Sequence, residues 1–441
     1  MSAFDTVIEK YRRIAFSERD KGYRFEVLMK NFLLTYPVYE GKFLEVWLWN
    51  EFPFRKDFGG RDLGIDIVAK TIEGEFWAVQ CKCYAEDSRI DKPAVDSFLS
   101  TSTKTFTDEQ GKTQKFSTRL FISTTNHWNH EATETIQNQI LPVLRLNLYD
   151  LQNAAVDWQK LDEGLFGSSA GKKFRIPLEH QLKAINATQN YFEKNSRGKL
   201  IMACGTGKTY TGLKIAEKIS PHGKILFLVP SIALLSQTLS EWTNYADKKI
   251  YPICVCSDET ASRGREDDSI KNVDLALPAT TDENKIATQL EFASTQKNFE
   301  MTVIFSTYQS IEKISQAQKK LGEDFKFDLI ICDEAHRTTG YGTEATAFTQ
   351  VHDENFISAK KRLYMTATPR LYTSDAKKKA TDKDLLLWSM DDEKIFGKEI
   401  FHIGFGEAVE KNLLSDYKVI VLTVSENNIL PIIKNATIEE S

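Results

Sequence analysis

Four short apolar runs in the second part of the chain restrict its fold more than any other feature. They read KILFLV (224–229), MTVIFS (301–306), FDLIIC (327–332) and KRLYMT (361–366), and stretches with helical spacing separate them. Strands that are apolar along their whole length are typical of a parallel sheet that helices cover on both faces. Residues 174–415 are therefore predicted to form an α/β domain with a parallel sheet.

The first part of the chain, residues 1–157, alternates between helical and strand patterns. Apolar spacing predicts a helix over residues 24–34 and strands over residues 118–125 and 143–150. The whole chain has 441 residues, which at roughly 150 residues per domain fits two or three domains. We therefore expect a separate α/β domain in this first part.

Three further stretches are assigned from their composition. The Gly- and Ser-containing stretch 158–173 is expected to be an interdomain linker, and the charged stretch 257–285 a surface insertion. Residues 416–441 begin with a strand pattern and are expected to open a further unit that the sequence does not complete.

Composition excludes several classes of protein. The net charge is only −5, and the six cysteines lack the C-x2-C spacing of structural zinc sites. Scattered thiols without a signal peptide suit a reducing cytoplasm. No apolar run approaches the roughly 20 residues of a membrane span, so we expect no membrane contact.

A glycine-rich motif in the second part predicts an ATP site. It follows a short strand, opens a helix, and departs from the strict phosphate-loop pattern because Met202 replaces the first glycine. Backbone N–H groups at a helix N-terminus bind phosphates, while a lysine reaches the terminal phosphates and a threonine hydroxyl holds Mg²⁺. The motif consists of Gly205, Thr206, Gly207, Lys208 and Thr209.

Two later strands end in residues that suit the same site. The run LIICDEAH places Asp333 and Glu334 at the carboxyl end of a strand, where parallel sheets bind their ligands. We expect Asp333 to hold Mg²⁺ and Glu334 to polarise the attacking water. His336 follows, either as part of the site or as an ordinary surface histidine. The strand YMTATPR also ends in hydroxyl groups.

Taken in order, these motifs resemble motifs I, II and III of DEAH-type superfamily 2 helicase ATPases. The resemblance implies a RecA-like domain in which Gln181 of PLEHQ contacts adenine and His336 belongs to the ATP site. It implies backbone contacts to nucleic acid at Ser231 and Thr307, for which plain strand-to-loop packing is the alternative. It also implies that ATP turnover is coupled to movement through Thr366, Ala367 and Thr368.

The helicase family carries its arginine finger on a second RecA-like domain, and an arginine finger contributes about 10³ to 10⁵ in rate. The sequence stops where the resemblance would begin that domain. We therefore expect the 441-residue chain to bind ATP and to turn it over slowly.

The run GIDIVAKTIEGEFWAVQCKCY (64–84) in the first part predicts a β-hairpin with polar residues on one face. Gln80 and Lys82 share a face because they are two residues apart. Asp66 joins them only if the turn has an odd number of residues. A three-residue turn (72–74) with Gly74 in the left-handed conformation pairs Asp66 with Gln80, so this register is predicted.

These three side chains suit Mg²⁺-dependent cleavage of phosphodiesters. Asp66 and Gln80 offer hard oxygen ligands, Lys82 adds positive charge, and Glu26 on the preceding helix could supply a second carboxylate. Asp62 is the alternative ligand if the register differs. The competing interpretation is a polar sheet face with a solvated lysine.

The hairpin resembles the PD-(D/E)xK nuclease core in its Mrr-like form, with Gln in place of Glu. Together with the motor motifs, the chain resembles the N-terminal part of type ISP restriction-modification enzymes. The fold class implied is α/β, a restriction-endonuclease-like mixed sheet followed by a RecA-like parallel sheet.

The type ISP resemblance also implies function. It implies an endonuclease and ATP-dependent translocase that acts on double-stranded DNA. Methyltransferase and target-recognition domains lie downstream in that family, so S-adenosylmethionine would bind only there. Two alternatives remain open, a repair or remodelling translocase with an inactive nuclease-fold clamp, and an RNA helicase with an interaction module.

Overall fold

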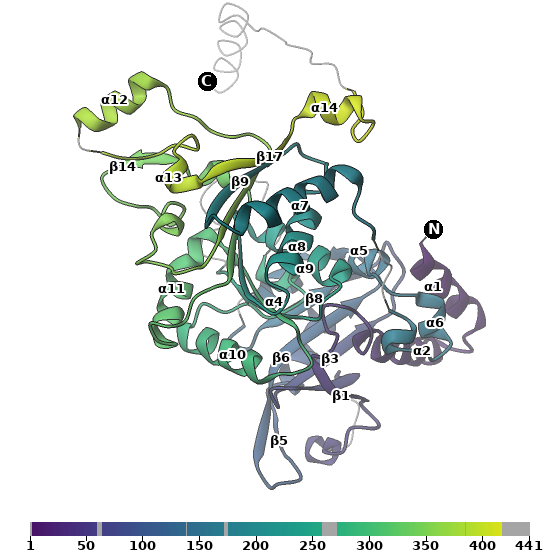
Figure 1. The fold of residues 1–441 in the computed structure, drawn as a ribbon. Coiled ribbons are helices and arrows are strands. Elements are labelled where there is room, and N and C mark those ends of the chain that lie inside the picture. The colour runs from purple at the N-terminus through teal and green to yellow at the C-terminus, as the bar shows by residue number, and fades with distance from the viewer. Residues whose placement is uncertain are drawn as a thin grey trace, which may run out of the picture.

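A computed structural model describes residues 2–59, 64–137, 139–171, 175–257, 271–383 and 385–416. It contains two α/β modules that lie against each other (Figure 1). The predicted fold class is confirmed, because a mixed sheet comes first in the chain and a parallel sheet follows. Of the stretch 416–441, expected to open a further unit, residues 417–441 lie outside the described residues.

The first module is built on a mixed sheet with strand order β1-β2-β3-β6-β5, to which β8 adds by pairing with β6. The pairs β1–β2, β2–β3 and β5–β6 are antiparallel, whereas β3–β6 and β6–β8 are parallel. The strands are β1 (Phe43–Leu48), β2 (Ile67–Thr71), β3 (Phe76–Lys82), β5 (Thr105–Thr107), β6 (Thr113–Ser123) and β8 (Val143–Leu146).

Helices cover both faces of this sheet. On one face lie α1 (Ala3–Ile14) and α2 (Glu18–Leu33), whose buried residues share a core with Trp77, Val79 and Cys81. On the other face α3 (Lys92–Thr101) and α4 (His130–Gln137) cover an aromatic core. Side chains of Ser2, Ser17 and Asp91 accept hydrogen bonds from the first turns of α1, α2 and α3, which fixes where these helices begin.

The stretch expected to be a linker begins inside the first module. Residues after α5 (Leu148–Asn153) form α6 (Trp158–Asp162). Trp158 is buried, with its ring centroid 4.7 Å from that of Phe4 and 5.2 Å from that of Phe32. The packed part of the first module therefore extends to at least Leu161, which is also buried.

The second module is a parallel sheet with strand order β11-β12-β10-β13-β15-β9-β17. All four apolar runs noted in the sequence are strands of it. The strands are β9 (Arg197–Met202), β10 (Lys224–Val229), β11 (Ile250–Val255), β12 (Met301–Thr307), β13 (Leu329–Cys332), β15 (Arg362–Thr366) and β17 (Lys398–Ile403).

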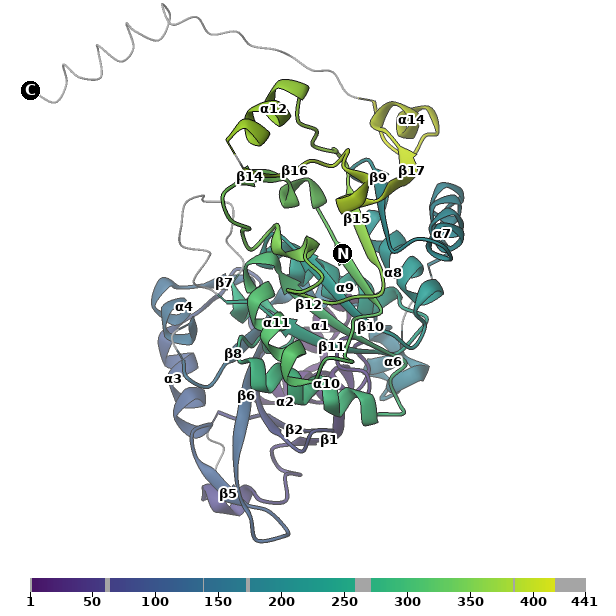
Figure 2. The same ribbon diagram turned by 60° about the vertical axis from the view of Figure 1, so that its left-hand side comes forward.

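Helices again cover both faces, as Figure 1 shows. One face packs on α7 (Glu179–Phe192), α8 (Lys208–Ile219) and α9 (Ile232–Tyr245), and the other on α10 (Glu283–Thr295) and α11 (Ile311–Lys320). Helix α12 and strand β5 lie at opposite ends of the molecule in both views (Figure 2). The remaining elements are β4 (Arg89–Ile90), β7 (His127–Trp128), β14 (Gly340–Gly342), β16 (Leu386–Trp388), α12 (Ser374–Asp382), α13 (Glu393–Phe396) and α14 (Phe405–Glu410).

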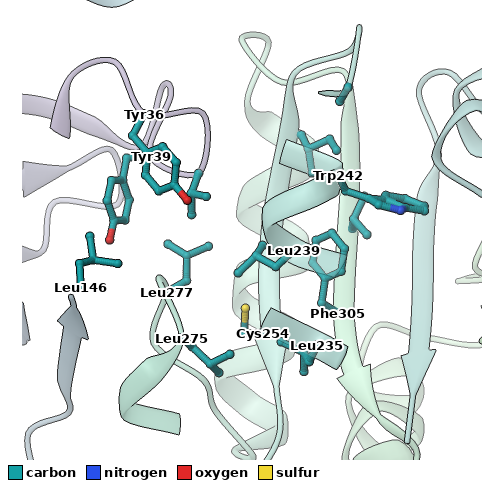
Figure 3. Close-up of a cluster of buried hydrophobic side chains, with 14 of the residues drawn as sticks. Tyr36, Tyr39, Leu146, Leu235, Leu239, Trp242, Cys254, Leu275, Leu277 and Phe305 are labelled. Atoms are coloured by element: carbon teal, nitrogen blue, oxygen red, sulfur yellow. The ribbon is translucent and has the colours of Figure 1, made fainter. Parts of the chain in front are cut away.

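A short segment wedged between the modules was not expected from the sequence. Part of the stretch 257–285, predicted to be a surface insertion, is buried, with Leu275 and Leu277 between the tyrosines of the first module and helix α9 (Figure 3). The Tyr39 hydroxyl donates to the Ala276 carbonyl at 2.8 Å, and Arg145 pairs with Asp274. The surface assignment is wrong for residues 273–277, because Leu275 and Leu277 join the core that both modules share and Val273 packs in the aromatic core of the first module.

Candidate functional site

The hairpin of the first module has the predicted register. Strand pairing sets Ile67 opposite Val79 and Lys70 opposite Phe76. The Thr71 amide donates to the Glu75 carbonyl at 2.8 Å, and Gly74 has φ +84°, so the turn has three residues. Continued by one residue, this register sets Asp66 opposite Gln80.

Asp66 and Gln80 meet where the two strands separate. The Cys81 amide donates to the Asp66 carboxylate at 2.6 Å, and Asp66 is half-buried. Gln80 is only 1% exposed, and its Oε1 has no hydrogen-bond partner among the described residues. A buried acceptor without a partner costs about 1–3 kcal/mol, so this oxygen suits a bound hard cation such as Mg²⁺.

Glu26 and Lys82 lie close to the same strand end. Burial raises the pKa of the Cys81 thiol, and the negative charges of Asp66 and Glu26 raise it further, which places the Glu26 carboxylate near them. The charge of Lys82, half-buried at the end of β3, lowers that pKa. Glu26 on α2 therefore lies on the part of the first module that contains Cys81 and the end of β3.

The acidic ligand set is small. Within the described ranges, no three His, Cys, Asp or Glu side chains are grouped closely enough to hold a metal ion by themselves. Asp62, the alternative ligand, lies outside the described residues. A metal at this position would therefore depend on the Gln80 amide oxygen and on main-chain oxygens.

The phosphate-binding motif of the second module lies at the N-terminus of α8, after β9. Gly205 and Gly207 both have φ +82°, and Gly207 is the residue that precedes the helix. Lys208 is buried, with its Nζ 4.0 Å from the exposed Cys204 thiol, and Thr209 is half-buried. The left-handed glycines leave the helix N-terminus without capping side chains, which suits a triphosphate.

Gln181 packs against this loop instead of standing free for a base. Its Oε1 accepts from the Leu178 amide at 2.9 Å, and its Nε2 donates to the Thr206 carbonyl at 3.2 Å. His180 contacts the same carbonyl through Nε2 at 2.9 Å, a role that the sequence did not indicate. Adenine contact by Gln181 would use its remaining N–H or lone pair.

Asp333 is buried beside the phosphate loop. Burial, and then the charge of Glu334, raise the pKa of Asp333, while the Glu334 amide and the charge of Lys208 lower it, and the net pKa is about 6. The Tyr308 hydroxyl donates to the Asp333 carbonyl oxygen at 2.8 Å. Glu334 has φ +47°, an uncommon conformation for a residue with a side chain, and such strain often accompanies function.

Motifs II and III contact each other directly. His336 Nδ1 lies 3.0 Å from the Thr366 hydroxyl and 3.3 Å from the Glu334 carboxylate. The Thr368 amide donates to the Thr366 hydroxyl at 3.2 Å, and Ala367 lies between them. His336, expected to belong to the nucleotide site, is therefore hydrogen-bonded to Thr366 at the end of β15.

The two residues expected to touch nucleic acid have structural partners. The Ser231 hydroxyl accepts from the Leu234 amide at 3.4 Å and caps α9. Thr307 is 3% exposed, and its hydroxyl donates to that of Ser310 at 3.3 Å. A hydroxyl contact from Thr307 to DNA would have to break this bond.

A cluster of one arginine, two tyrosines and a glutamate beside the phosphate loop was not predicted from the sequence. The Arg175 guanidinium lies 4.6 Å from the Tyr210 ring and 5.4 Å from the Tyr245 ring, and it pairs with Glu241 at 3.1 Å. No local pattern links these four residues, because Arg175 precedes α7 and reaches the others only once α8 and α9 have packed together.

Each of the two modules matches a protein-family model. Residues 34–165 match the model described as a restriction endonuclease, and residues 175–371 match the model of the type III restriction enzyme res subunit. The chain therefore combines a segment similar to restriction endonucleases with a segment similar to the helicase-type subunit of restriction enzymes.

Among solved structures, the chain is similar to the ATP-dependent type ISP restriction-modification enzyme LlaBIII bound to DNA. The similarity covers 97% of this chain with 36% identity and a TM-score of 0.73, but only 27% of the LlaBIII chain. The particular enzymes it resembles are thus of type ISP, in agreement with the sequence.

Curated relatives match between about half and two thirds of the chain. A probable helicase of African swine fever virus is 31% identical over 242 residues, which cover 54% of this chain and 23% of the relative. The endonuclease subunit of the type I restriction enzyme EcoAI from Escherichia coli is 26% identical over 297 residues, 63% of this chain and 29% of the relative. This chain therefore spans about a quarter of the length of these proteins. No helix of the described part is long and apolar enough to cross a membrane.

Proposed function

We propose that this chain is the nuclease and first motor part of an enzyme that cleaves double-stranded DNA and moves along it with ATP. The observation that carries the proposal is the partnerless buried oxygen of Gln80, set opposite Asp66 by a three-residue turn. The proposal includes a cytoplasmic location, which the six free thiols suit. It also includes downstream methyltransferase and target-recognition domains as partners, by analogy with type ISP enzymes.

In the nuclease site, Asp66, Gln80 and Glu26 would hold Mg²⁺. The ion, when bound, acidifies a water molecule and offsets the charge that develops on the phosphate. Asp66 is oriented for this role by the Cys81 amide. Lys82 binds a nonbridging phosphate oxygen and orients the nucleophile through its positive charge.

In the motor, Thr209 and Asp333 would hold the Mg²⁺ that accompanies ATP. Lys208 binds the terminal phosphates, and the amides of residues 205–209 bind phosphate oxygens. Gln181 orients the phosphate loop through the Thr206 carbonyl and borders the adenine position. Glu334 orients the attacking water.

Coupling of ATP turnover to movement would pass through the contact of His336 with Thr366. Loss of the terminal phosphate changes the surroundings of Glu334, whose carboxylate lies 3.3 Å from His336. The histidine then moves the loop that contains Thr366, Ala367 and Thr368. Ser231, two residues beyond β10, and Thr307, the last residue of the neighbouring β12, lie at the same sheet edge and would border the path of DNA.

One observation favours a second candidate function. Because no group of three acidic, histidine or cysteine ligands occurs among the described residues, the first module could act as a DNA clamp that does not cut. In that case the motor would serve repair or remodelling. Detectable Mg²⁺-dependent cleavage separates the two functions.

The deciding experiment is cleavage of a two-site plasmid by the full-length enzyme, with and without ATP and Mg²⁺. Replacing a group that stabilises developing charge commonly costs 10²- to 10³-fold, so Lys82→Ala should cut at least about 100-fold more slowly. Lys70→Ala, on the neighbouring strand but far from the site, is the matched control. Wild-type cutting by Lys82→Ala would refute the nuclease assignment.

A further inference from the structure

The corner between helices α1 and α2 combines exposed aromatic and basic side chains. We define the α1–α2 corner as residues 10–24. Phe16 at its tip is 93% exposed, and Tyr23 is 47% exposed. An exposed aromatic side chain of this kind has no role in the core of the module.

The corner is basic although the chain is acidic. It holds six Lys and Arg side chains and two acidic ones, while the whole chain has a net charge of −5. Arg13 and Arg19 are exposed and form no ion pair with any residue that the structure describes. The other four cations are paired, in the pairs Lys10–Asp162, Arg12–Glu9, Lys21–Glu18 and Arg24–Asp20.

The corner is joined to the strand that carries the nuclease residues. Arg12 Nη2 donates to the Tyr84 carbonyl at 3.1 Å, two residues beyond Lys82. On α2, Arg19, Tyr23 and Glu26 are four and three residues apart and thus lie on one face of the helix. Arg19 and Tyr23 therefore lie on the same face of α2 as the proposed metal ligand Glu26, closer to the N-terminus of the helix.

Gly22 supports an external ligand at this face. It lies inside α2, where glycine is unfavourable, and a Cβ built on it would meet nothing within 4 Å. Packing within the described protein thus does not require glycine here. A glycine in such a place suits close approach of another backbone.

We propose that the α1–α2 corner binds the backbone of duplex DNA and positions it at the nuclease site. Arg13 and Arg19 bind phosphates, and Phe16 inserts between base steps or packs on a sugar. The basic charge favours DNA as the occupant over a protein partner, for which one exposed ring offers little apolar area. The inference rests on the proposed nuclease function and adds to it the surface that receives the substrate.

The proposal can be tested on the 441-residue chain by measuring its affinity for a fluorescent DNA duplex of about 20 base pairs. Fluorescence anisotropy reports the binding, in EDTA and without ATP. Each phosphate contact contributes a factor of about 8 at about 0.1 M salt, so Arg13→Glu with Arg19→Glu should weaken binding about 60-fold. The slope of log K against log salt should become shallower by about 2. The matched control is Lys112→Glu with Lys115→Glu, on the exposed hairpin of β5 and β6 at the other end of the sheet, which should bind like wild type.

Cleavage by the full-length enzyme provides a second measurement. Phe16→Ser removes an exposed ring that is not part of the core. This variant should cut the plasmid more slowly than wild type. Its temperature of thermal unfolding should equal that of wild type. The inference falls if the double arginine variant binds and cuts as well as the lysine control. It also falls if light scattering shows that the corner joins two copies of the chain and that these variants separate them.

Failure of the inference and failure of the proposed function are distinguishable. If Lys82→Ala does not cut DNA while the double arginine variant cuts normally, the nuclease assignment is supported and the DNA-binding role of the α1–α2 corner is refuted. If Lys82→Ala cuts DNA normally while the double arginine variant binds DNA more weakly, the α1–α2 corner is supported as a DNA-binding surface and the nuclease assignment is refuted.

Discussion

Asp333→Asn should stabilise the ligand-free chain although it removes a residue proposed to hold Mg²⁺. The Asp333 carboxyl is 4% exposed, and burial, then the charge of Glu334, raises its pKa from 3.8 to about 6. The folded chain at neutral pH therefore carries a charge that the unfolded chain would solvate better. Asparagine has nearly the same shape, keeps an oxygen for the Glu334 amide, and carries no charge.

The magnitude follows from the pKa difference between the folded and unfolded states. A difference of about 2 corresponds to about 3 kcal/mol, so the variant should gain up to about 3 kcal/mol in unfolding free energy at pH 7.5. Between pH 4 and pH 6 the folded wild type holds a proton that the unfolded chain has lost, so its stability falls as pH rises through this window. The gain of the variant should therefore shrink to about half at pH 5.

Urea unfolding of the two chains at pH 7.5 and pH 5, in EDTA, measures this difference directly. Asp150, whose pKa burial also raises to about 6, contributes equally to both chains and cancels. Asp96→Asn, an exposed change on α3, is the control and should stay within about 0.5 kcal/mol of wild type. Equal stability of Asp333→Asn and wild type at pH 7.5, or a gain that does not change with pH, would refute the reasoning.

Two further predictions concern motif coupling and the limits of the first module. His336→Ala removes a hydrogen bond worth about 1 kcal/mol and should lower DNA-stimulated ATP turnover of the full-length enzyme about fivefold. Its affinity for a fluorescent ATP analogue should not change, and an equal loss of affinity would contradict a coupling role. Trp158→Ala should cost about 3–5 kcal/mol in urea unfolding, because the ring is buried between Phe4 and Phe32. A loss below about 1 kcal/mol would mean that residues from 158 onward do act as a linker.

The parts of the fold and site that depend on local rules could be predicted from the sequence. The placement of Gly74 set the length of the turn, and the turn set the register that brings Asp66 opposite Gln80. Apolar runs identified the parallel strands, and parallel strands bring their carboxyl ends to one edge. The order of the motifs was therefore enough to gather Lys208 and Asp333 at one place.

The parts that depend on contacts between distant segments could not be predicted. Leu275 and Leu277 alternate as in a strand, but their partners lie in another module. Gln181 has the spacing of an adenine ligand, yet the loop carbonyl that it bonds is known only once α7 and α8 are packed. Composition places Trp158 just after the predicted boundary of the first domain, but its packing against Phe4 and Phe32 makes it part of the core of the first module.

The buried wedge of residues 273–277 has a consequence for how such enzymes diversify. Because Leu275 and Leu277 belong to a core that both modules share, a nuclease domain taken from a distant relative would not match the shape of the motor surface. The two modules must therefore change together over evolutionary time, and sequence variation at Tyr39 should be accompanied by variation near Leu277.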